Sequence, residues 1–399
     1  MIRITSLGGS GEDSRNCFLL QSDSCNVLLD CGVRREIATV SRVYPNLTAE
    51  IVSSLDYVII SHAHEDHTAA LPYLYELGYR KNIYASEETI DLIPGYLRKW
   101  AEYVEKNNGI LPFDKNNIDK LSYKPLKQLD LNIKYGRSGH MIGSLWYLFT
   151  MENHRILYTG DTTMDSLLLV TDPYPEADTV IIDSAYAGKV LDQKQQYRAL
   201  AEYSRRNKGR LLLPAPANGR GIDMFEWLKS QKLNPSAENN ILKNTASFFS
   251  EKDWIKDISS SEADYTAVTS EIRNSDLPGT YLFGDGMMTT AAAAEYLETV
   301  KDNPDSTIII SGHSAAGTLA NNLLKEEYRR ENNIKCRVVQ LTIKVHLDEE
   351  DVLKVISQCR AQNVMLFHSQ KKNCSALKKK LQNNSINVVC GTEDSLILN

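Results

Sequence analysis

The sequence predicts an α/β protein, and three observations support this prediction. Short apolar runs rich in Val, Ile and Leu alternate with longer segments of helical periodicity. Apolar residues make up 42% of the chain and charged residues 24%, which is ordinary for a globular protein. With 399 residues the chain is too long for one compact core, so we expect two domains.

Five of the apolar runs are expected to be strands. The polar residues that follow these strands are expected to form a single site. Functional side chains in open α/β sheets gather beyond the carboxyl ends of the strands. The runs cover residues 26–29, 57–60, 155–158, 179–182 and 364–367, and each is closely followed by an acid or a histidine: Asp30, His62, Asp161, Asp183 and His368.

The middle of the chain contains a second series of strands. Apolar runs at 211–213, 281–283 and 307–310 lead into the glycine-rich turns PAPANGRG, GDGMMTT and SGHSAAGT. The polar segment 234–244 and the SSSE run near Ser260 are expected to be loops. The first pattern returns over 338–348 and 363–368. We therefore expect one domain over 1–190, completed by 336–399, with a second domain inserted at 191–335.

The charge balance argues against a protein that holds nucleic acid by charge alone. The chain has 45 basic and 51 acidic residues, a net charge of −6, and the stretch 191–330 has 17 basic and 19 acidic residues. One local basic cluster runs from Arg205 to Arg210, with Arg220 shortly after. It is either a phosphate track or a solvated helix end. The glycine-rich turns could offer backbone N–H groups to a phosphate.

The cysteines and the start of the chain indicate a cytoplasmic protein. Seven scattered cysteines contain no CxxC pair, which favours buried free thiols in a reducing compartment. The first residues, MIRITSLGGSGEDS, do not resemble a secretory signal. No apolar run approaches the ~20 residues that a membrane helix needs.

The strongest local feature is the segment His-Ala-His-Glu-Asp-His at 62–67, which holds three of the chain's eight histidines. Neutral imidazole suits zinc, and a carboxylate adds an oxygen ligand. His62 and His64 are expected to project together from an extended turn, while Asp66 and His67 face a neighbouring position. This arrangement favours two adjacent metal ions.

One short segment cannot complete two coordination shells, so further ligands must come from elsewhere. His140 lies between glycines in SGHMIGS, Asp161 follows YTG and could bridge two ions, and His368 ends the strand VMLF. Taken alone, His140 would more often be a loop histidine than a ligand, Asp161 would be a helix cap or turn aspartate, and a strand-end histidine such as His368 is a ligand only in a minority of cases. Asp30, in LLLDCG, is expected to orient a ligand through a hydrogen bond.

These residues resemble a known family. Asp30, HAHEDH, His140 and Asp161 are similar in order and spacing to the motifs of the metallo-β-lactamase superfamily. Further along, the chain resembles the β-CASP branch, the metal-dependent nucleases that include bacterial ribonuclease J and the 3′-end processing endonuclease of eukaryotic mRNA. The markers are GHMIGS, YTGD, IIDSAY, PAPANGRG, GDGMM, SGHSAAGTL, VHLD and LFHS.

The resemblance implies a fold and a set of roles. The fold is a metallo-β-lactamase αββα sandwich with an inserted α/β β-CASP cap domain. His62, His64 and His140 would bind one ion, Asp66, His67 and His368 the second, and Asp161 would lie between them. Asp183 matches the acid of motif A, His346 the histidine of motif B and His368 that of motif C. The ions are expected to be zinc, with manganese as an alternative.

The residues suffice for hydrolysis of a phosphodiester. Two ions can hold a bridging hydroxide and offset charge on the leaving group, with Asp66 orienting the hydroxide and His346 acting as general acid. A structural role for His346 stays open, because the following Asp348 can cap a helix over EEDVLKVISQ. The chain also departs from the branch, in which small residues precede the motif B histidine. Here Lys344 and Val345 stand in those places.

Three functions remain open. The first is a metallonuclease that cuts RNA, or less readily DNA. The second is a two-metal hydrolase of a small phosphodiester, ester or thioester. The third is a non-catalytic binding subunit, but the presence of a suitable residue at all seven ligand positions argues against it. RNA is the expected partner, no membrane is, and a homodimer is an option. Because the sequence ends at Asn399, we expect it to lack the extra C-terminal domain of ribonuclease J. Substrate contacts are expected at Arg220, Ser314, Gly317 and Thr318.

Overall fold

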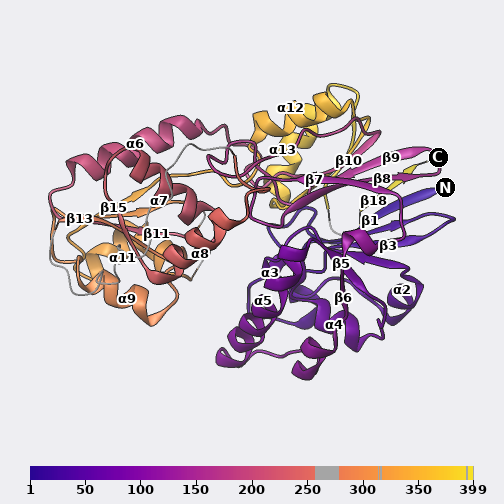
Figure 1. Cartoon of the computed structure of the whole chain (residues 1–399), viewed down its shortest axis with the longest axis horizontal. Helices are drawn as coiled ribbons and strands as arrows, with labels where there is room; N and C mark the ends of the chain where they lie inside the picture. Colours follow the sequence, from indigo (N-terminus) through magenta and orange to yellow (C-terminus); the bar gives the residue numbers. More distant parts are fainter. Residues whose placement is uncertain (257–277, 313, 315–316, 392–393, 399) are drawn as a thin grey trace. The chain divides into compact units, whose positions relative to one another are not determined.

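The computed structural model describes residues 1–256, 278–312, 314, 317–391 and 394–398 (Figure 1). By their internal contacts the residues divide into two compact units, which we call unit 1 and unit 2. Unit 1 comprises Met1–Met164, Thr171–Val190 and His346–Asn399, and unit 2 comprises Asp165–Val170 and Leu191–Val345.

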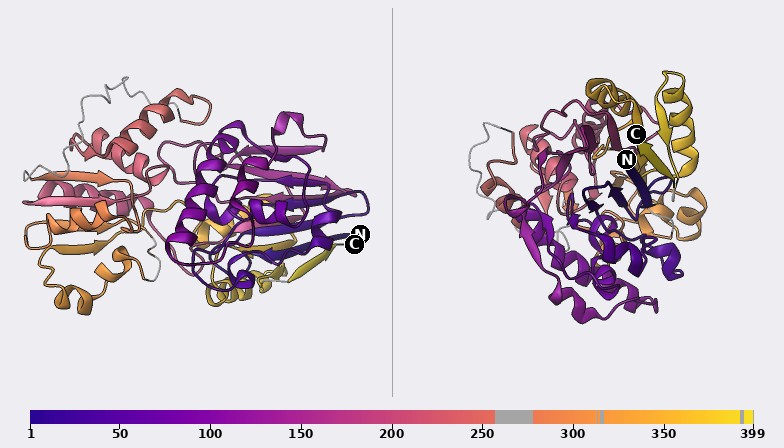
Figure 2. Two further views of the ribbon diagram at one scale, coloured as in Figure 1. Left: turned by 90° about the horizontal axis from the view of Figure 1, so that it is seen from below. Right: turned by 90° about the vertical axis from the view of Figure 1, so that its right-hand side faces the viewer.

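The first sheet of unit 1 has seven strands in the order β18-β1-β2-β3-β4-β5-β6. Strands β3 to β6 run parallel, whereas β18, β1, β2 and β3 pair antiparallel. β1 and β18 lie side by side although they come from opposite ends of the chain (Figure 2). The strands are β1 (Ile2–Gly8), β2 (Cys17–Gln21), β3 (Asn26–Leu29), β4 (Tyr57–Ile59), β5 (Ile83–Ala85), β6 (Tyr123–Pro125) and β18 (Ser395–Leu398).

The second sheet of unit 1 has six strands in the order β17-β16-β10-β9-β8-β7. Aromatic side chains join the two sheets, since the ring of Phe18 lies 5.6 Å from that of Tyr158 and 5.2 Å from that of Phe367. The strands are β7 (Ile133–Arg137), β8 (Leu145–Met151), β9 (His154–Tyr158), β10 (Thr179–Asp183), β16 (Asn363–Phe367) and β17 (Asn387–Val389).

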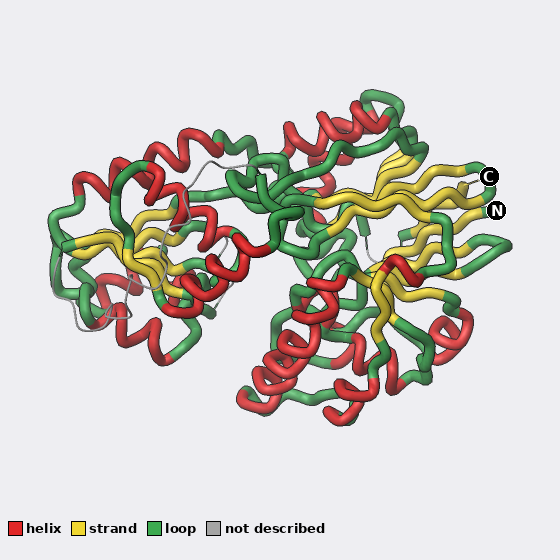
Figure 3. Tube along the Cα trace, viewed as in Figure 1, coloured by secondary structure: helices red, strands yellow, loops and turns green. Residues whose placement is uncertain are grey.

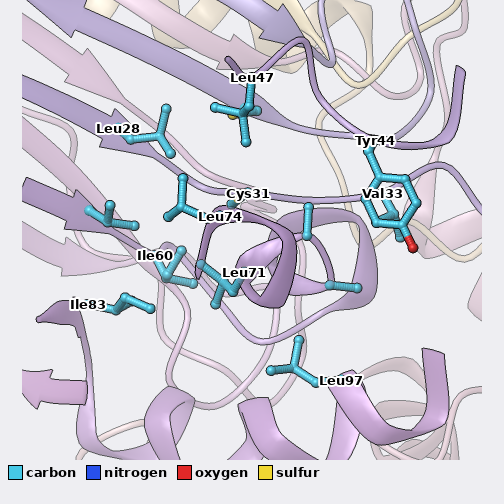
Figure 4. Close-up of a cluster of buried hydrophobic side chains, with 14 of the residues drawn as sticks. Leu28, Cys31, Val33, Tyr44, Leu47, Ile60, Leu71, Leu74, Ile83 and Leu97 are labelled. Carbon is cyan, nitrogen blue, oxygen red and sulfur yellow. The ribbon is translucent and has the colours of Figure 1, made fainter. Parts of the chain in front are cut away.

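Helices cover the outer face of each sheet in unit 1 (Figure 3). Figure 4 shows the core under the first sheet, where Leu28 of β3 packs with Leu74 and Leu97 of two covering helices. The first sheet is covered by α2 (Ala49–Ser54), α4 (Leu71–Glu76) and α5 (Glu87–Lys106), and the second sheet is covered by α12 (Glu349–Cys359) and α13 (Lys371–Gln382). Shorter helices are α1 (Val40–Val43), α3 (Glu65–Thr68) and the 3₁₀ turns Lys115–Lys120 and Leu126–Gln128. The predicted αββα sandwich is confirmed.

Unit 2 contains a parallel five-stranded sheet in the order β12-β13-β11-β14-β15, with helices on both faces (Figure 2). Leu211 and Leu213 of β11 contact one helical layer, and Leu212 contacts the other. The strands are β11 (Arg210–Pro214), β12 (Ser236–Ala237), β13 (Gly279–Phe283), β14 (Thr307–Ile310) and β15 (Arg337–Gln340). One layer contains α6 (Gln193–Arg206), α7 (Arg220–Ser230) and α8 (Asn239–Ser250), and the other contains α9 (Ala291–Glu298), α10 (Leu319–Leu323) and α11 (Glu326–Glu331).

Two details differ from the sequence prediction. Segment 234–244, expected to be a loop, contains β12 and the start of α8. Residues 338–348 were expected to belong to the first domain, but β15 pairs in parallel with β14, so unit 2 extends to Val345 rather than to 335. The SSSE run near Ser260 lies outside the described residues. In the described part of the chain, no helix is both long and apolar enough to cross a membrane.

Candidate metal centre

The candidate ligands lie in unit 1 on loops that follow strands of both sheets. His62 to His67 follow β4, and α3 begins within them. His140 follows β7, Asp161 follows β9 and His368 directly follows β16. The sandwich thus gathers residues from 62 to 368 at one edge, as expected for the carboxyl ends of parallel strands.

The first group of potential ligands consists of His62, His64, His140 and Asp161, whose nearest ligand atoms lie within 4.8 Å of one another. His64 Nδ1 is 3.1 Å from His62 Nε2 and 3.1 Å from His140 Nε2. Asp161 Oδ2 lies 3.6 Å from His62 Nε2 and 3.7 Å from His140 Nε2.

The second group consists of Asp66, His67, Asp161 and His368, again within 4.8 Å. His67 Nε2 lies 3.1 Å from Asp161 Oδ1 and 3.7 Å from Asp66 Oδ2. His368 Nε2 lies 3.1 Å from Asp66 Oδ2 and 3.4 Å from Asp161 Oδ2. Asp161 therefore belongs to both groups and presents a carboxylate oxygen to each.

These separations fit four-coordinate ions. Zinc–nitrogen bonds of 2.0–2.1 Å in a tetrahedron place neighbouring ligand atoms about 3.3 Å apart. The separations within both groups, from 3.1 to 3.7 Å, lie around that value. One side-chain oxygen of Asp161 is also buried without a hydrogen-bond donor, although buried carboxylate oxygens normally have a partner. Its orphaned oxygen fits a cation.

The protonation of the cluster also suits metal ions. Burial lowers the pKa of His62, and that of His64 to about 4, so both imidazoles are neutral and keep a lone pair for an ion. Burial opposes charge on His67, but Asp161, Asp66 and Asp30 raise its pKa well above the usual value. The carboxylates around His67 thus favour a positive charge at this position, which a divalent ion would supply.

A third group lies beside the ligands and pairs an acid with a histidine. His346 Nδ1 is 2.9 Å from Asp183 Oδ2 and 3.7 Å from Asp161 Oδ2. Asp183 is fully buried at the end of β10 and accepts hydrogen bonds from the backbone N–H of Thr162 and of Ala185. Because the carboxylate only accepts, Nδ1 of His346 carries a proton, and Nε2 is left for other chemistry.

Asp30 contacts the second group through Nδ1 of His67, the ring nitrogen that does not face Asp161. Its carboxylate accepts hydrogen bonds from His67 Nδ1 at 2.6 Å, from the backbone N–H of Ser61 at 2.6 Å and from Ser61 Oγ at 2.7 Å. The hydroxyl of Tyr158 donates to the same carboxylate. This network fixes the ring of His67 and directs Nε2 at the ligand position.

Several neighbours of the candidate ligands were not predicted from the sequence. Asn16 Nδ2 is 2.8 Å from His67 Nε2, and the ring of Tyr96 on α5 lies 5.7 Å from that of His64. Ser61 and Tyr158, which bind Asp30, were likewise not predicted. Ser61 directly precedes the HAHEDH segment and Tyr158 begins the YTGD marker, but their residue types do not indicate a contact with Asp30, and Asn16 and Tyr96 lie in no marker, so these contacts are visible only in the fold.

Backbone geometry at the site is unusual at two of its residues. Asp30 and His368 have φ angles of 56° and 61°, in the left-handed region, and each directly follows a strand. Gly32 lies against the HAHEDH segment so closely that a Cβ there would be 1.6 Å from the carbonyl oxygen of Asp66. These positions turn the chain so that several loops reach one centre.

The expected substrate residues lie in unit 2. Arg220 is the first residue of α7, and a Cβ at Gly312 would lie 2.1 Å from its Nη1. Ser314 is buried and accepts a hydrogen bond from Asn321, and Thr318 caps α10 through the N–H of Asn321. In the nearby basic cluster Arg210 is buried against Tyr281, so it packs within the domain.

Comparison with known proteins agrees with this geometry. Residues 10–212 match the family model of the metallo-beta-lactamase superfamily, and residues 331–390 match that of the Zn-dependent metallo-hydrolase RNA specificity domain. Transcription termination factor FttA of Methanothermobacter thermautotrophicus is 26% identical over 92% of this chain and 66% of its own length, so the chain spans about two thirds of that relative.

Two further relatives and one solved structure extend the comparison. An RNase J-like protein of Methanocaldococcus jannaschii is 25% identical over 93% of both chains, and Integrator complex subunit 11 of Gallus gallus is 23% identical over 96% of this chain and 71% of its own. A crystal structure of a protein of unknown function from Enterococcus faecalis V583 has the same fold, with a TM-score of 0.63 and 14% identity over all of both chains.

These findings confirm the expected resemblance, the fold class and the class of metal-dependent hydrolase. The match over 10–212 covers half of the sequence and includes all but one of the candidate ligands, His368 being the exception. The chain therefore belongs to the metallo-beta-lactamase superfamily and, with these relatives, to its β-CASP branch.

Proposed function

We propose that this protein is a two-metal ribonuclease that hydrolyses phosphodiester bonds of RNA. The observation that carries the proposal is the presence of two ligand groups that share Asp161, with the Asp183–His346 pair beside them. A single centre with two cation positions and an adjacent proton donor is what hydrolysis of a phosphodiester requires.

We assign the ligands from the geometry of the two groups. His62, His64 and His140 would hold one ion, Asp66, His67 and His368 the other, and Asp161 both. Three imidazoles in the first group favour zinc, and the carboxylates also allow manganese. When bound, the ions supply Lewis acidity, which polarises a phosphoryl oxygen and lowers the pKa of water.

The remaining residues position groups and move a proton. Asp66, which is partly exposed, can accept a hydrogen bond from the attacking water and orient it. Asp183 holds His346 through Nδ1, so that Nε2 is the atom that gives a proton to the leaving oxygen. Asp30 acts through His67 and keeps that ring in place.

RNA is the substrate that the comparisons favour. Residues 331–390 match a family whose description names RNA specificity, and one relative is named RNase J-like along nearly its whole length. We propose that unit 2 is the cap domain and that Arg220, Ser314, Gly317 and Thr318 contribute to substrate binding. All seven cysteines are free thiols, which supports the cytoplasm as the location.

The test compares two substrates on the same protein. Purified full-length chain, with its metal content measured by elemental analysis, is incubated with 5′-labelled single-stranded RNA and separately with bis-p-nitrophenyl phosphate, each with Zn²⁺ or Mn²⁺. We expect cleavage of the RNA. Hydrolysis of the small diester with no RNA cleavage under any metal condition would instead identify a small-molecule hydrolase.

Two variants control this experiment. The double variant Asp66→Ala/His67→Ala removes ligands of the second group and is expected to abolish cleavage of both substrates. His154→Ala removes a histidine of β9 that is hydrogen-bonded to Thr179 Oγ1 and is not in either ligand group, so it should retain activity. RNA cleavage that persists in the double variant would point to a contaminating nuclease.

A further inference from the structure

A row of aromatic and basic side chains begins beside the metal ligands and runs along α5. Tyr96, Lys99 and Tyr103 recur at helical spacing on this helix, and Arg35 reaches Tyr103 from the loop after β3. We call these four residues the α5 track. All four belong to unit 1, as do the ligands.

The track starts at the first ligand group. The ring of Tyr96 meets the imidazole of His64 edge-on, with centroids 5.7 Å apart and an interplanar angle of 75°. The ammonium of Lys99 lies 5.6 Å from the centroid of the same ring. Tyr96 is therefore between a metal ligand and a positive charge.

The track continues two helical turns further on. Seven residues separate Tyr96 from Tyr103, a rise of about 10.5 Å along the helix. The guanidinium of Arg35 lies over the ring of Tyr103 at 4.7 Å from its centroid. Both tyrosines are half-buried, and Arg35 and Lys99 are exposed, so rings and charges border solvent.

Arg35 is held in this place by a second contact. Its Nη1 donates to Glu65 Oε2 at 2.7 Å, and Glu65 is part of the HAHEDH segment. The track thus contains two cations, Arg35 and Lys99, and the contact of Arg35 with Glu65 connects it directly to the ligand loop.

Such a surface has the chemistry of a single-stranded RNA site. Unpaired bases stack on tyrosine rings and on guanidinium planes, while the neighbouring cations attract the phosphates. At 3.4 Å per stacked base, the distance between the tyrosines corresponds to about three nucleotides. A small diester without bases would gain nothing from it.

We propose that the α5 track binds the bases of an RNA strand whose scissile phosphate lies at the metal centre. This inference rests on the proposed ribonuclease function. It adds the surface along which the RNA extends away from the metal centre. Tyr103 and Arg35 would take one base by stacking, and Tyr96 a base nearer to the cut.

The first test measures RNA binding by fluorescence anisotropy in full-length protein that also carries His346→Gln, so that cleavage is slowed. Tyr103→Leu keeps the apolar bulk of the side chain but has no aromatic face. We expect this variant to bind single-stranded RNA roughly 5- to 150-fold more weakly, since stacking one base contributes about that factor. Tyr103→Phe should restore the binding.

A matched control exists on α4. The guanidinium of Arg80 lies 3.6 Å from the ring centroid of Tyr75, the same kind of pair as Arg35 and Tyr103. Arg80 precedes β5 and so lies at the amino end of that strand, away from the edge that holds the ligands. Tyr75→Leu is expected to bind RNA as the wild type does.

The second test locates the stacked base. A set of RNA oligonucleotides, each with one abasic position, is bound to wild type and to Tyr103→Leu. One position should weaken binding to the wild type and cost little in the variant, because the lost base and the lost ring belong to one contact. Equal losses at every position in both proteins would overturn the proposal.

The outcomes separate the two claims. If the wild type cleaves RNA while Tyr103→Leu binds it as tightly as Tyr75→Leu does, the α5 track is refuted and the ribonuclease function stands. If the wild type neither binds nor cleaves RNA, both fall. Tyr96→Phe and Tyr96→Leu are compared in the same binding assay. Their metal content is measured as well, because the ring of Tyr96 contacts His64.

Discussion

Replacement of Asp30 by asparagine tests whether a residue that cannot touch an ion controls metal binding. Asp30 is fully buried and accepts hydrogen bonds from His67, Ser61 and Tyr158. Asparagine has nearly the same shape, and it tolerates the left-handed backbone at φ 56°. The substitution therefore removes charge and one acceptor with little change in packing or backbone strain.

The structure sets the expected size of the effect. Four donors point at the carboxylate, whereas an asparagine offers one acceptor oxygen and adds two donors of its own. With at least one buried donor left unpaired and the others bonded to a neutral group, we expect the unfolding free energy to fall by about 2–5 kcal/mol. Loss of the group that orients a ligand should weaken metal binding by about 10- to 100-fold.

Two measurements check these values. Competition with a chromogenic chelator gives the affinity for Zn²⁺, and urea unfolding of metal-free protein gives the stability. Asp56→Asn is the matched control, because Asp56 precedes β4 of the same sheet but is exposed, and its substitution should change stability by less than about 0.5 kcal/mol. If Asp30→Asn binds Zn²⁺ as tightly as Asp56→Asn does, Asp30 does not orient His67 as argued.

Three further predictions concern other parts of the molecule. Asp161→Ala, which removes the carboxylate shared by both ligand groups, should leave less than one tightly bound ion per chain by elemental analysis, and retention of two would refute a shared ligand. His346→Gln should slow RNA cleavage by about 10²- to 10⁴-fold with unchanged metal content, and loss of metal would show that its role is structural. Burial raises the pKa of Asp223 to about 6, although hydrogen bonds, including one from Ser166, oppose this shift. The contribution of this carboxyl group to stability is therefore present below about pH 4 and is lost as the pH rises through 6. Relative to wild type, Asp223→Asn should therefore gain up to about 3 kcal/mol of unfolding free energy between pH 4 and pH 7, and urea titrations at the two pH values check this.

Much of the candidate metal centre could be predicted because the proposed ligands follow recognisable strands. Chemically specific residues directly after apolar runs indicate both where a strand ends and what it carries, as with Asp161 and His368. The capping box of α12, in which Asp348 accepts from the N–H of Asp351, was also predicted from the sequence. It coexists with the His346–Asp183 contact, so a capping role for Asp348 does not compete with a chemical role for His346.

What the sequence did not reveal depends on contacts between distant residues. Tyr96 is an ordinary half-buried position of an amphipathic helix until the fold places it beside His64. β15 has polar residues at both ends, and only its pairing with β14 assigns it to unit 2. Segment 234–244 was predicted as a loop because it is largely polar, whereas packing of Ile241 and Leu242 stabilises the helix.

The discontinuity of unit 1 has a consequence for how the protein is made. Ile2 pairs with Leu398, and β10 lies between β9 and β16, so both sheets need strands that follow unit 2 in the sequence. His346 and His368 are synthesised after the whole of unit 2. During translation, unit 2 can fold while its host is still incomplete, and the nascent chain cannot cut the RNA around it. Hydrolytic activity would thus appear only after the residues up to His368 have left the ribosome.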